Sequence, residues 1–306
     1  MENKYTFGKD TYVYNDSCGV KMTNFIPLAP PQSQNGVVGL EYVMNPRPVF
    51  DDPNYKACGK LMGKVAIITG GDSGLGRAAA IAFAKEGANV VIPYFDEHID
   101  ADETKRIIES YNQQCLLLSG DISKREFCEK VVCETIQRFG KIDILVNNAG
   151  VQYQSDTLEG ISDEQFDWTM KVNIYGMFYL TRACLPYLKE GSSIINLTSV
   201  TTFEGDPQLM DYVTTKGAIV GFTRSLARNL ALKKIRVNAI APGFFWTPLQ
   251  PNCWVPNKIP TLGANAAVGH GAMPYQLAPT YVFLASDDSC YMTGQVVHVN
   301  GGEIMG

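Results

Sequence analysis

Three side chains in the second half of the chain have the types and spacing of a proton-transfer site. Tyr212 and Lys216 are four residues apart, so on a helix they lie on one face. A free tyrosine has a pKa of about 10 and is a poor base near neutral pH, but a neighbouring ammonium favours the phenolate and lowers that pKa. Ser199 ends a predicted strand, where ligands bind in open α/β sheets. This group predicts a site at which Tyr212 exchanges a proton with a substrate oxygen.

A glycine-rich segment, TGGDSGLGR, begins at Thr69 and places Gly70, Gly74 and Gly76 between a predicted strand and a predicted helix. Glycine lets the backbone turn tightly and approach a pyrophosphate, which then lies at the helix N-terminus, where free N–H groups and the helix dipole favour anions. A glycine cluster alone can mark a simple turn. Its position after the first strand of a strand-helix alternation favours nucleotide binding.

The elements that position these residues alternate along the chain from Lys64. Short apolar runs predict strands at 65–69, 90–95, 115–119, 142–147, 193–199, 235–241 and 295–299. Helix-length segments lie between them at 74–87, 99–113, 123–139, 163–189, 211–232 and 275–286. The runs are continuously apolar, as in strands buried on both faces. The pattern predicts a doubly wound α/β (Rossmann) fold, with a seven-stranded parallel sheet and helices on both faces.

Residues 1–60 have a different character. They contain the proline-rich stretches APPQSQNG (29–36) and NPRPVFDDPNY (45–55), with no sustained helix or strand period. We expect an extended N-terminal arm that docks through its apolar side chains, namely Tyr42, Val43, Met44, Val49, Phe50 and Tyr55. Nothing in the arm resembles a catalytic group, so we expect it to add stability and to stay out of the active site. Residues 61–306 are expected to form a single dinucleotide-binding and catalytic domain.

Composition excludes several classes of partner. The net charge is −5, which offers no basic surface to nucleic acid or to an anionic membrane. The longest apolar run, 78–84, is far shorter than the ~20 residues of a membrane span, and residues 1–10 lack the features of a signal peptide. The cysteines and histidines are scattered, without the close spacing of a metal site or a disulfide framework. We therefore expect a soluble cytoplasmic protein without a metal.

The motifs together resemble one family. TGGDSGLG is similar to the T-G-x-x-x-G-x-G signature of the short-chain dehydrogenase/reductases, and the resemblance covers about residues 64–306. It continues in order through NNAG (147–150), Asn173, Ser199, YVTTK (212–216) and PGFFWT (242–247). The segment before residue 64 and the phrase HVNGG (298–302) resemble a glucose/ribitol dehydrogenase-like bacterial branch of this family.

The resemblance implies hydride transfer between a nicotinamide cofactor and a secondary alcohol or ketone. It assigns catalysis to Asn173, Ser199, Tyr212 and Lys216. Ser199 would hydrogen-bond the substrate oxygen, Tyr212 would exchange the proton, and Lys216 would also hold the nicotinamide ribose. Asn173 would keep a water that links Lys216 to solvent. Two other classes stay open: a nucleotide-sensing protein without turnover, and a non-redox epimerase or dehydratase on the same scaffold.

The family's cofactor contacts carry over by position. They are Gly70, Ser73, Gly74, Leu75, Gly76, Tyr94, Asp96, Asp121, Ile122, Asn148, Ala149, Gly150, Tyr212, Lys216, Pro242, Gly243, Phe245 and Thr247. An acidic side chain ~20 residues beyond the glycines bonds the ribose 2′-OH, whereas a basic one accepts a 2′-phosphate. Asp96 and Glu97 stand at that distance and would repel a phosphate, which favours NAD over NADP. Arg77 is the alternative, as a phosphate ligand.

Two further expectations concern the substrate and the assembly. The substrate pocket is expected from 200–211 and 244–275, whose members Thr201, Phe203, Phe244, Phe245, Trp246, Leu249 and Trp254 suit an apolar or ring-shaped alcohol or ketone. Segment 163–189 is apolar nearly all round, so one side should face the sheet and the other a symmetry-related copy. Members of the family that the chain resembles commonly form tetramers through this segment and the Tyr212 helix, so the resemblance implies a homotetramer.

Overall fold

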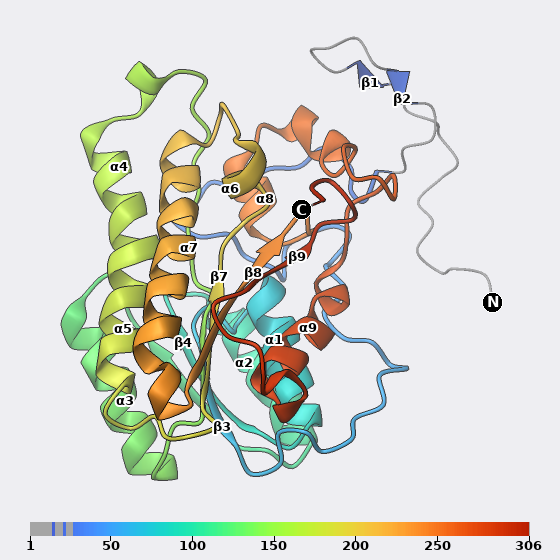
Figure 1. The fold of residues 1–306 in the computed structure, drawn as a ribbon. Coiled ribbons are helices and arrows are strands. Elements are labelled where there is room, and N and C mark those ends of the chain that lie inside the picture. Colours follow the sequence, from blue (N-terminus) through green and yellow to red (C-terminus); the bar gives the residue numbers. More distant parts are fainter. Residues whose placement is uncertain (1–13, 16–20, 23–26, 306) are drawn as a thin grey trace.

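The computed structural model describes residues 14–15, 21–22 and 27–305, shown in Figure 1. Its strands are β1 (Tyr14–Asn15), β2 (Lys21–Met22), β3 (Val65–Ile68), β4 (Asn89–Tyr94), β5 (Cys115–Ser119), β6 (Ile144–Asn147), β7 (Ser193–Leu197), β8 (Arg236–Pro242) and β9 (Val296–Val299). Its α-helices are α1 (Gly74–Lys85), α2 (His98–Ser110), α3 (Arg125–Phe139), α4 (Asp163–Met170), α5 (Met177–Cys184), α6 (Thr201–Glu204), α7 (Met210–Leu230), α8 (Leu249–Cys253) and α9 (Ala278–Ala285).

The main sheet has seven strands in the order β5-β4-β3-β6-β7-β8-β9, and every neighbouring pair is parallel. This confirms the predicted doubly wound fold. The strand order reverses between β3 and β6, whose register pairs Ala66 with Ile144. At such a switch point the loops after the two strands diverge and leave a crevice at their carboxyl ends. The short antiparallel pair β1–β2 is separate from this sheet.

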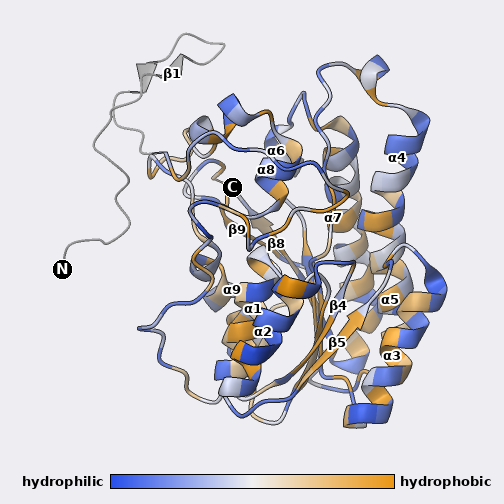
Figure 2. Ribbon diagram, turned by 180° about the vertical axis from the view of Figure 1, so that it is seen from behind, coloured by the Kyte–Doolittle hydropathy of each residue, from blue (hydrophilic) through white to orange (hydrophobic). Residues whose placement is uncertain are grey.

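Helices cover both faces of the sheet. Helices α1, α2 and α9 lie on one face, and α3, α5 and α7 lie on the other (Figure 1). Figure 2 shows hydrophobic strands between helices that alternate hydrophobic and hydrophilic residues. The two faces bury separate apolar clusters, one centred on Phe83 and Ile92 and the other on Val131 and Leu145. Within the described ranges no helix is long and apolar enough to cross a bilayer.

The segment expected as one helix over 163–189 is broken into parts. Helix α4 begins after Ser162, whose hydroxyl accepts a hydrogen bond from Gln165 N at 3.2 Å. A π-helical turn, η2 (Lys171–Gly176), then separates α4 from α5. Such wide turns are rare and are frequent at functional sites. The interruption matters here because η2 carries Asn173.

Residues 27–60 of the arm contain no helix or strand and run along the surface of the α/β domain. Met44 is buried, and Phe50 packs against the cluster around α1 and α9, as expected. Tyr42 and Val43 do not dock: their side chains are 39% and 51% exposed. The prediction was wrong for these two because they are the central residues of a turn, closed by Met44 N donating to Glu41 O at 3.1 Å, which directs both side chains outward.

The end of the arm is held by one buried carboxylate, that of Glu86 at the C-terminal end of α1. It accepts hydrogen bonds from the Tyr55 hydroxyl at 2.5 Å, from Cys58 N at 3.1 Å and from Lys60 N at 2.8 Å. A carboxylate at a helix C-terminus is disfavoured by the helix dipole, so these contacts must supply its compensation. The Lys60 side chain forms a separate, exposed ion pair with Asp288.

We expect Glu86→Ala to lower the free energy of unfolding by about 3 kcal/mol, because it leaves two half-buried backbone N–H groups without an acceptor. Urea denaturation measures the change. Lys60→Ala is the matched control, since it removes only an exposed ion pair and should leave stability nearly unchanged. Equal losses in the two variants would show that Glu86 does not anchor the arm.

Candidate active site

Two adjoining cavities open at the carboxyl ends of the strands, where the sheet order reverses. The first, of about 180 Å³, lies over the glycine turn, and the second, of about 290 Å³, lies over Ser199 and Tyr212. They share wall residues that include Leu75, Asn148 and Thr247. Together they have the size of a small-molecule site, ~300–1,000 Å³.

The cavities collect most of the residues singled out from sequence. The first is lined by Gly70, Ser73, Gly74, Leu75, Tyr94, Asp121, Ile122, Asn148, Ala149, Gly150 and Thr247. The second is lined by Ser199, Tyr212, Lys216, Pro242, Gly243 and Phe245, together with Leu75, Asn148, Gly150 and Thr247. Gly76 does not line either cavity but lies in close contact with Gly70 of the turn. Asp96 is exposed and does not line either cavity, so the structure does not bring it to the site.

The glycines are required by close backbone approach. Gly70 and Gly74 have φ values of +63° and +51°, which are strained for other residues. A Cβ at Gly76 would lie 2.0 Å from Gly70 O and 2.6 Å from Asn148 Nδ2. Asn148 in turn donates from Nδ2 to Thr69 O at 2.9 Å, which joins the loop after β6 to the turn after β3. The turn is thereby held rigidly at the start of α1.

Ser199, Tyr212 and Lys216 face one another across the second cavity. The Lys216 ammonium lies 5.3 Å from the centre of the Tyr212 ring and donates to Leu197 O at 2.8 Å. The Ser199 hydroxyl accepts from Thr201 Oγ1 at 2.9 Å. All three side chains are buried, although they lie at the ends of β7 and α7. The two helix residues are brought together by the predicted four-residue spacing.

Burial shifts the pKa values of Tyr212 and Lys216 in opposite directions. It raises the pKa of Tyr212 to about 12, and the Ser199 hydrogen bond only partly counteracts this. Burial also lowers the pKa of Lys216 to about 8. The expectation that Lys216 brings the tyrosine pKa below 10 was therefore wrong for this state, because desolvation of the buried phenol dominates. Lys216 still carries its charge at pH 7.

Asn173 lies in η2 and connects three elements. Its Nδ2 donates to Val151 O at 2.9 Å and to Thr215 Oγ1 at 3.0 Å, and its Oδ1 accepts from Val151 N at 2.8 Å. It also lines a small cavity of about 10 Å³ with Asn147, whose Oδ1 has no partner within the described part of the chain. That volume is near the minimum for one water molecule.

Two buried carboxylates, Asp72 and Glu97, line the far end of the first cavity, near Tyr94. Burial is the main cause that raises the pKa of each, and the charge of Glu97 adds to the effect on Asp72. Glu97 was expected here. The sequence analysis missed Asp72, although this residue lies within the glycine motif. The conformation of the turn decides which side chains of the motif face the cavity, and the sequence does not indicate it.

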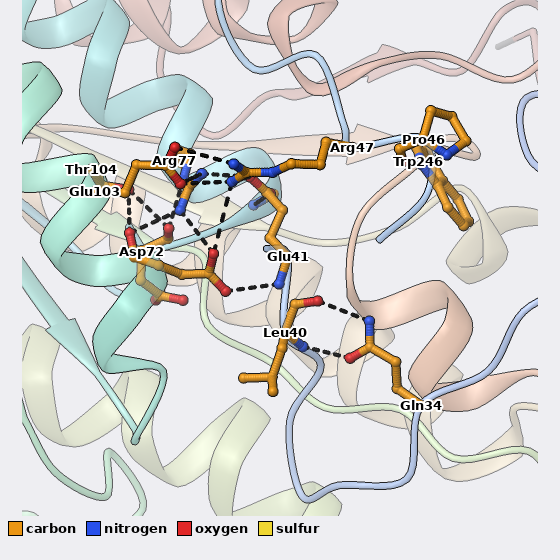
Figure 3. Close-up of polar contacts among 12 residues, drawn as sticks. Gln34, Leu40, Glu41, Pro46, Arg47, Asp72, Arg77, Glu103, Thr104 and Trp246 are labelled. Carbon is orange, nitrogen blue, oxygen red and sulfur yellow. Dashed lines mark hydrogen bonds and ion pairs between the residues drawn. The ribbon is translucent and has the colours of Figure 1, made fainter. Parts of the chain in front are cut away.

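Arg77 is not placed to bind a phosphate. Its side chain is fully buried and donates to Asp72 O at 2.7 Å and to Asp100 O at 2.8 Å (Figure 3). It also pairs with the carboxylates of Glu41 and Glu103, at 2.7 and 3.1 Å. The sequence-based alternative that Arg77 accepts a 2′-phosphate is contradicted, because every face of the guanidinium is already used.

The second cavity is more polar than expected. Phe244, Leu249 and Trp254 line it, but Trp246 is buried elsewhere and donates to Pro46 O, and Phe203 makes an edge-on contact with His298. Three carboxylates that were not foreseen, those of Glu204, Asp206 and Glu303, line it instead. Burial, reinforced by Glu204 and Asp206, raises the pKa of Glu303 to about 7. Glu303 lies about a hundred positions after Glu204 and Asp206, so no local pattern could have grouped the three.

The arm also reaches the site, which corrects the expectation that it stays outside. Val37, Val38 and Gly39 line the first cavity, opposite the glycine turn. No sequence signal marked them, because an arm without a regular period gives no indication of its path.

Comparison with known proteins agrees with this geometry. A family model described as enoyl-(acyl carrier protein) reductase matches residues 70–303. The chain is 43% identical over 282 residues to glucose and ribitol dehydrogenase of Daucus carota, covering 90% of this chain and 97% of the relative. The chain is a short-chain dehydrogenase/reductase. The predicted family and its glucose/ribitol dehydrogenase-like branch are confirmed, and this family member is an NAD(P)-dependent oxidoreductase.

Other relatives differ in the cofactor that they are named for. This short-chain dehydrogenase/reductase is 46% identical to NADPH-dependent aldehyde reductase 1 of Arabidopsis thaliana, covering 90% of this chain and 98% of the relative. It superposes on a Burkholderia cenocepacia short-chain dehydrogenase in complex with NADP (27% identity, TM-score 0.76, 80% and 99% covered). It also superposes on a Brucella melitensis 3-ketoacyl-(acyl-carrier-protein) reductase complexed with NADH (35% identity, TM-score 0.74, 80% and 100% covered).

The residues at the first cavity fit a nicotinamide dinucleotide. The glycine turn lines the cavity without side chains, and it leads directly into α1, whose N-terminus favours an anion such as a pyrophosphate. Apolar walls at Ile122 and Phe127 suit the adenine end. The junction with the second cavity, at Thr247, suits the nicotinamide end.

We expect Gly76→Ala to destabilise the fold by about 2 kcal/mol and to weaken dinucleotide binding, because the new methyl group displaces the Gly70 carbonyl. Thermal melting and calorimetric titration measure the two effects. Gly221→Ala is the control: its Cβ meets nothing within 4 Å, and alanine in a helix should raise stability by about 0.5–1 kcal/mol. Normal dinucleotide affinity in Gly76→Ala would contradict the assignment of the glycine turn to the dinucleotide site.

Proposed function

We propose that this chain transfers a hydride between a nicotinamide dinucleotide and a secondary alcohol or ketone, with Ser199, Tyr212 and Lys216 as its catalytic groups. The observation that carries the proposal is the convergence of these three buried side chains in a cavity that shares its wall with the glycine-turn cavity. A substrate carbon at the shared wall would lie beside both the proton-transfer group and the dinucleotide.

Each residue has a defined role in this proposal. The bound nicotinamide supplies or accepts the hydride. Ser199 hydrogen-bonds the substrate oxygen, and Tyr212 donates a proton to it or removes one. Lys216 holds a positive charge near the Tyr212 oxygen and bonds the ribose. Asn173 fixes η2 and, with the small cavity beside Asn147, keeps one water near the base of the site.

The substrate class follows from the walls of the second cavity. Carboxylates accept hydrogen bonds from hydroxyl groups, and Glu204, Asp206 and Glu303 offer several such acceptors around the reacting end. Phe244 adds an apolar face of the kind that sugars and polyols pack on. We propose a polyhydroxylated substrate, which agrees with the name of the carrot relative. A panel of polyols, sugars, simple alcohols and aldehydes, read by the absorbance of the reduced cofactor, tests this.

We further propose that the protein is a cytoplasmic homotetramer. Tyr175 and Phe178 are exposed on the outer side of α5 and η2, beside Phe222 of α7. Such an apolar face suits a second copy of the chain. The buried thiols Cys128 and Cys184 suit a reducing compartment. Light scattering after size exclusion measures the assembly.

A nucleotide sensor without turnover is the second candidate, favoured by the high pKa of Tyr212, which opposes its action as a base. Dinucleotide binding with no product from any member of the panel would support that candidate.

We expect Tyr212→Phe to lower kcat by at least about a hundredfold with little change in dinucleotide Kd, because the phenol moves a proton and does not hold the cofactor. Lys216→Ala should lower kcat and also raise the Kd, since the ammonium has both tasks. Steady-state kinetics and calorimetry separate the two parameters. Substantial turnover by Tyr212→Phe would rule out the assigned proton transfer.

We expect NAD⁺ to bind at least about tenfold more tightly than NADP⁺ because Asp72 and Glu97 repel a 2′-phosphate. Burial raises the pKa of Asp72 to about 8, so this carboxyl loses its proton as the pH rises through that value, and NADP⁺ should then weaken relative to NAD⁺. Glu97→Gln should reduce both the preference and its pH dependence. Calorimetric titration tests this, and tighter binding of NADP⁺ by the wild type would contradict it.

A further inference from the structure

Residues 34–41 of the arm, called the strap below, cross the mouth of the first cavity. Val37, Val38 and Gly39 line that cavity together with the glycine turn. We propose that the strap is part of the dinucleotide site, and that it encloses the bound dinucleotide and sets the rate at which it leaves. The proposal rests on the proposed function, because it takes the first cavity to hold a nicotinamide dinucleotide.

One end of the strap is attached to the glycine turn itself. Glu41 Oε2 accepts a hydrogen bond from Gly74 N at 2.6 Å, and Gly74 begins α1. Glu41 N donates to Asp100 Oδ2 at 2.7 Å. Glu41 Oε1 lies 2.7 Å from Arg77 Nη1, an ion-pair contact without the alignment of a hydrogen bond. The Glu41 side chain is fully buried, so this end cannot move without exposing or unpairing a charge.

The other end is attached to the segment after β8, which also lines the cavity. Gln34 N donates to Pro251 O at 2.7 Å, and Asn252 Nδ2 donates to Gly36 O at 3.3 Å. Gly39 lies so close to the chain after β8 that a Cβ would be 2.3 Å from Pro248 O. Both Pro248 and Asn252 line the first cavity. The strap thus joins the loop before α1 to the segment that contains α8.

Between its two attachments the strap is closed on itself and only loosely covered. The Gln34 side chain accepts from Leu40 N at 2.6 Å and donates to Leu40 O at 2.8 Å, which closes the loop (Figure 3). The intervening residues 35–37 are exposed, with Val37 at 51%. In residues 35–37 the Asn252–Gly36 hydrogen bond is long and exposed, so this stretch can open locally at lower cost than the buried attachment at Glu41.

This geometry predicts where the strap acts. A dinucleotide that spans from Asp72 to Thr247 passes beneath Val37 and Val38, because all four residues line one cavity. The ligand therefore gains apolar contacts from the strap after it has entered, and it cannot leave until the strap opens. Interactions of this kind change the dissociation rate more than the association rate.

The test is the release of the reduced dinucleotide, NADH or NADPH, whichever binds the wild type more tightly. Stopped-flow fluorescence measures the rate when excess oxidised dinucleotide displaces it. The double variant Val37→Gly/Val38→Gly removes the apolar contacts without changing charge, and Gln34→Ala removes the closure of the loop. We expect each to raise the dissociation rate about tenfold, with a smaller change in the association rate.

Val43→Gly is the matched control. Val43 lies on the same arm, is 51% exposed and does not line the described cavities. It should leave the dissociation rate unchanged. Hydrogen exchange gives a readout independent of these variants: the backbone amides of Gln34 and Leu40 should exchange more slowly in the wild type when the dinucleotide is bound.

The outcomes separate the two proposals. The strap proposal is overturned if the wild type binds tightly and the dissociation rates of the strap variants are within about twofold of the wild-type rate. An effect of the strap variants on release, without turnover of any alcohol or carbonyl compound, supports the strap and overturns the oxidoreductase proposal. Failure of the wild type to bind either dinucleotide overturns both. If the double variant does not fold, Gln34→Ala and hydrogen exchange decide.

Discussion

The buried guanidinium of Arg77 connects the arm, the glycine turn and helix α2. An arginine remains charged even when it is buried, and removing one partner of such a group costs about 3–5 kcal/mol. Arg77 meets that demand with Glu41, Asp100 and Glu103, which come from two segments otherwise free to separate. Burial raises the pKa of Glu41 to about 7 in spite of the attraction of Arg77. The start of α1, the position of α2 and the path of the arm all depend on this cluster.

The sheet and the proximity of Tyr212 to Lys216 were predictable because their signals are local. Continuous apolar runs such as 65–69 and 90–95 indicated buried parallel strands, and the spacing of Tyr212 and Lys216 needed only a helix to bring them together. The order of the motifs then placed the glycine turn and the loop after β6 at one edge of the sheet. These inferences depend on short stretches whose conformation is set by their own sequence.

The remaining features depend on contacts between distant segments. Asp96 is separated by 20 positions from Gly76, as the acidic residue of the motif should be, yet Asp72 and Glu97 face the cavity and Asp96 faces solvent. The pKa of Tyr212 follows from how completely the surrounding chain covers it, which spacing does not indicate. The arm has no period, so neither its register nor its contact with the cavity could be derived from its residues alone.

The arm's contacts also bear on the order in which the molecule can assemble. Pro46 O accepts a hydrogen bond from Trp246, 200 residues later, and Gln34 is bonded to Pro251. During synthesis the arm emerges first, while the segment that receives it emerges near the end. Met44 packs in the cluster that contains Trp246 and Trp254, so it cannot reach its buried position until that segment has been made and the long loop has closed. Proline-rich sequence suits such a segment, since proline cannot donate to a strand edge and discourages mispairing on the growing chain.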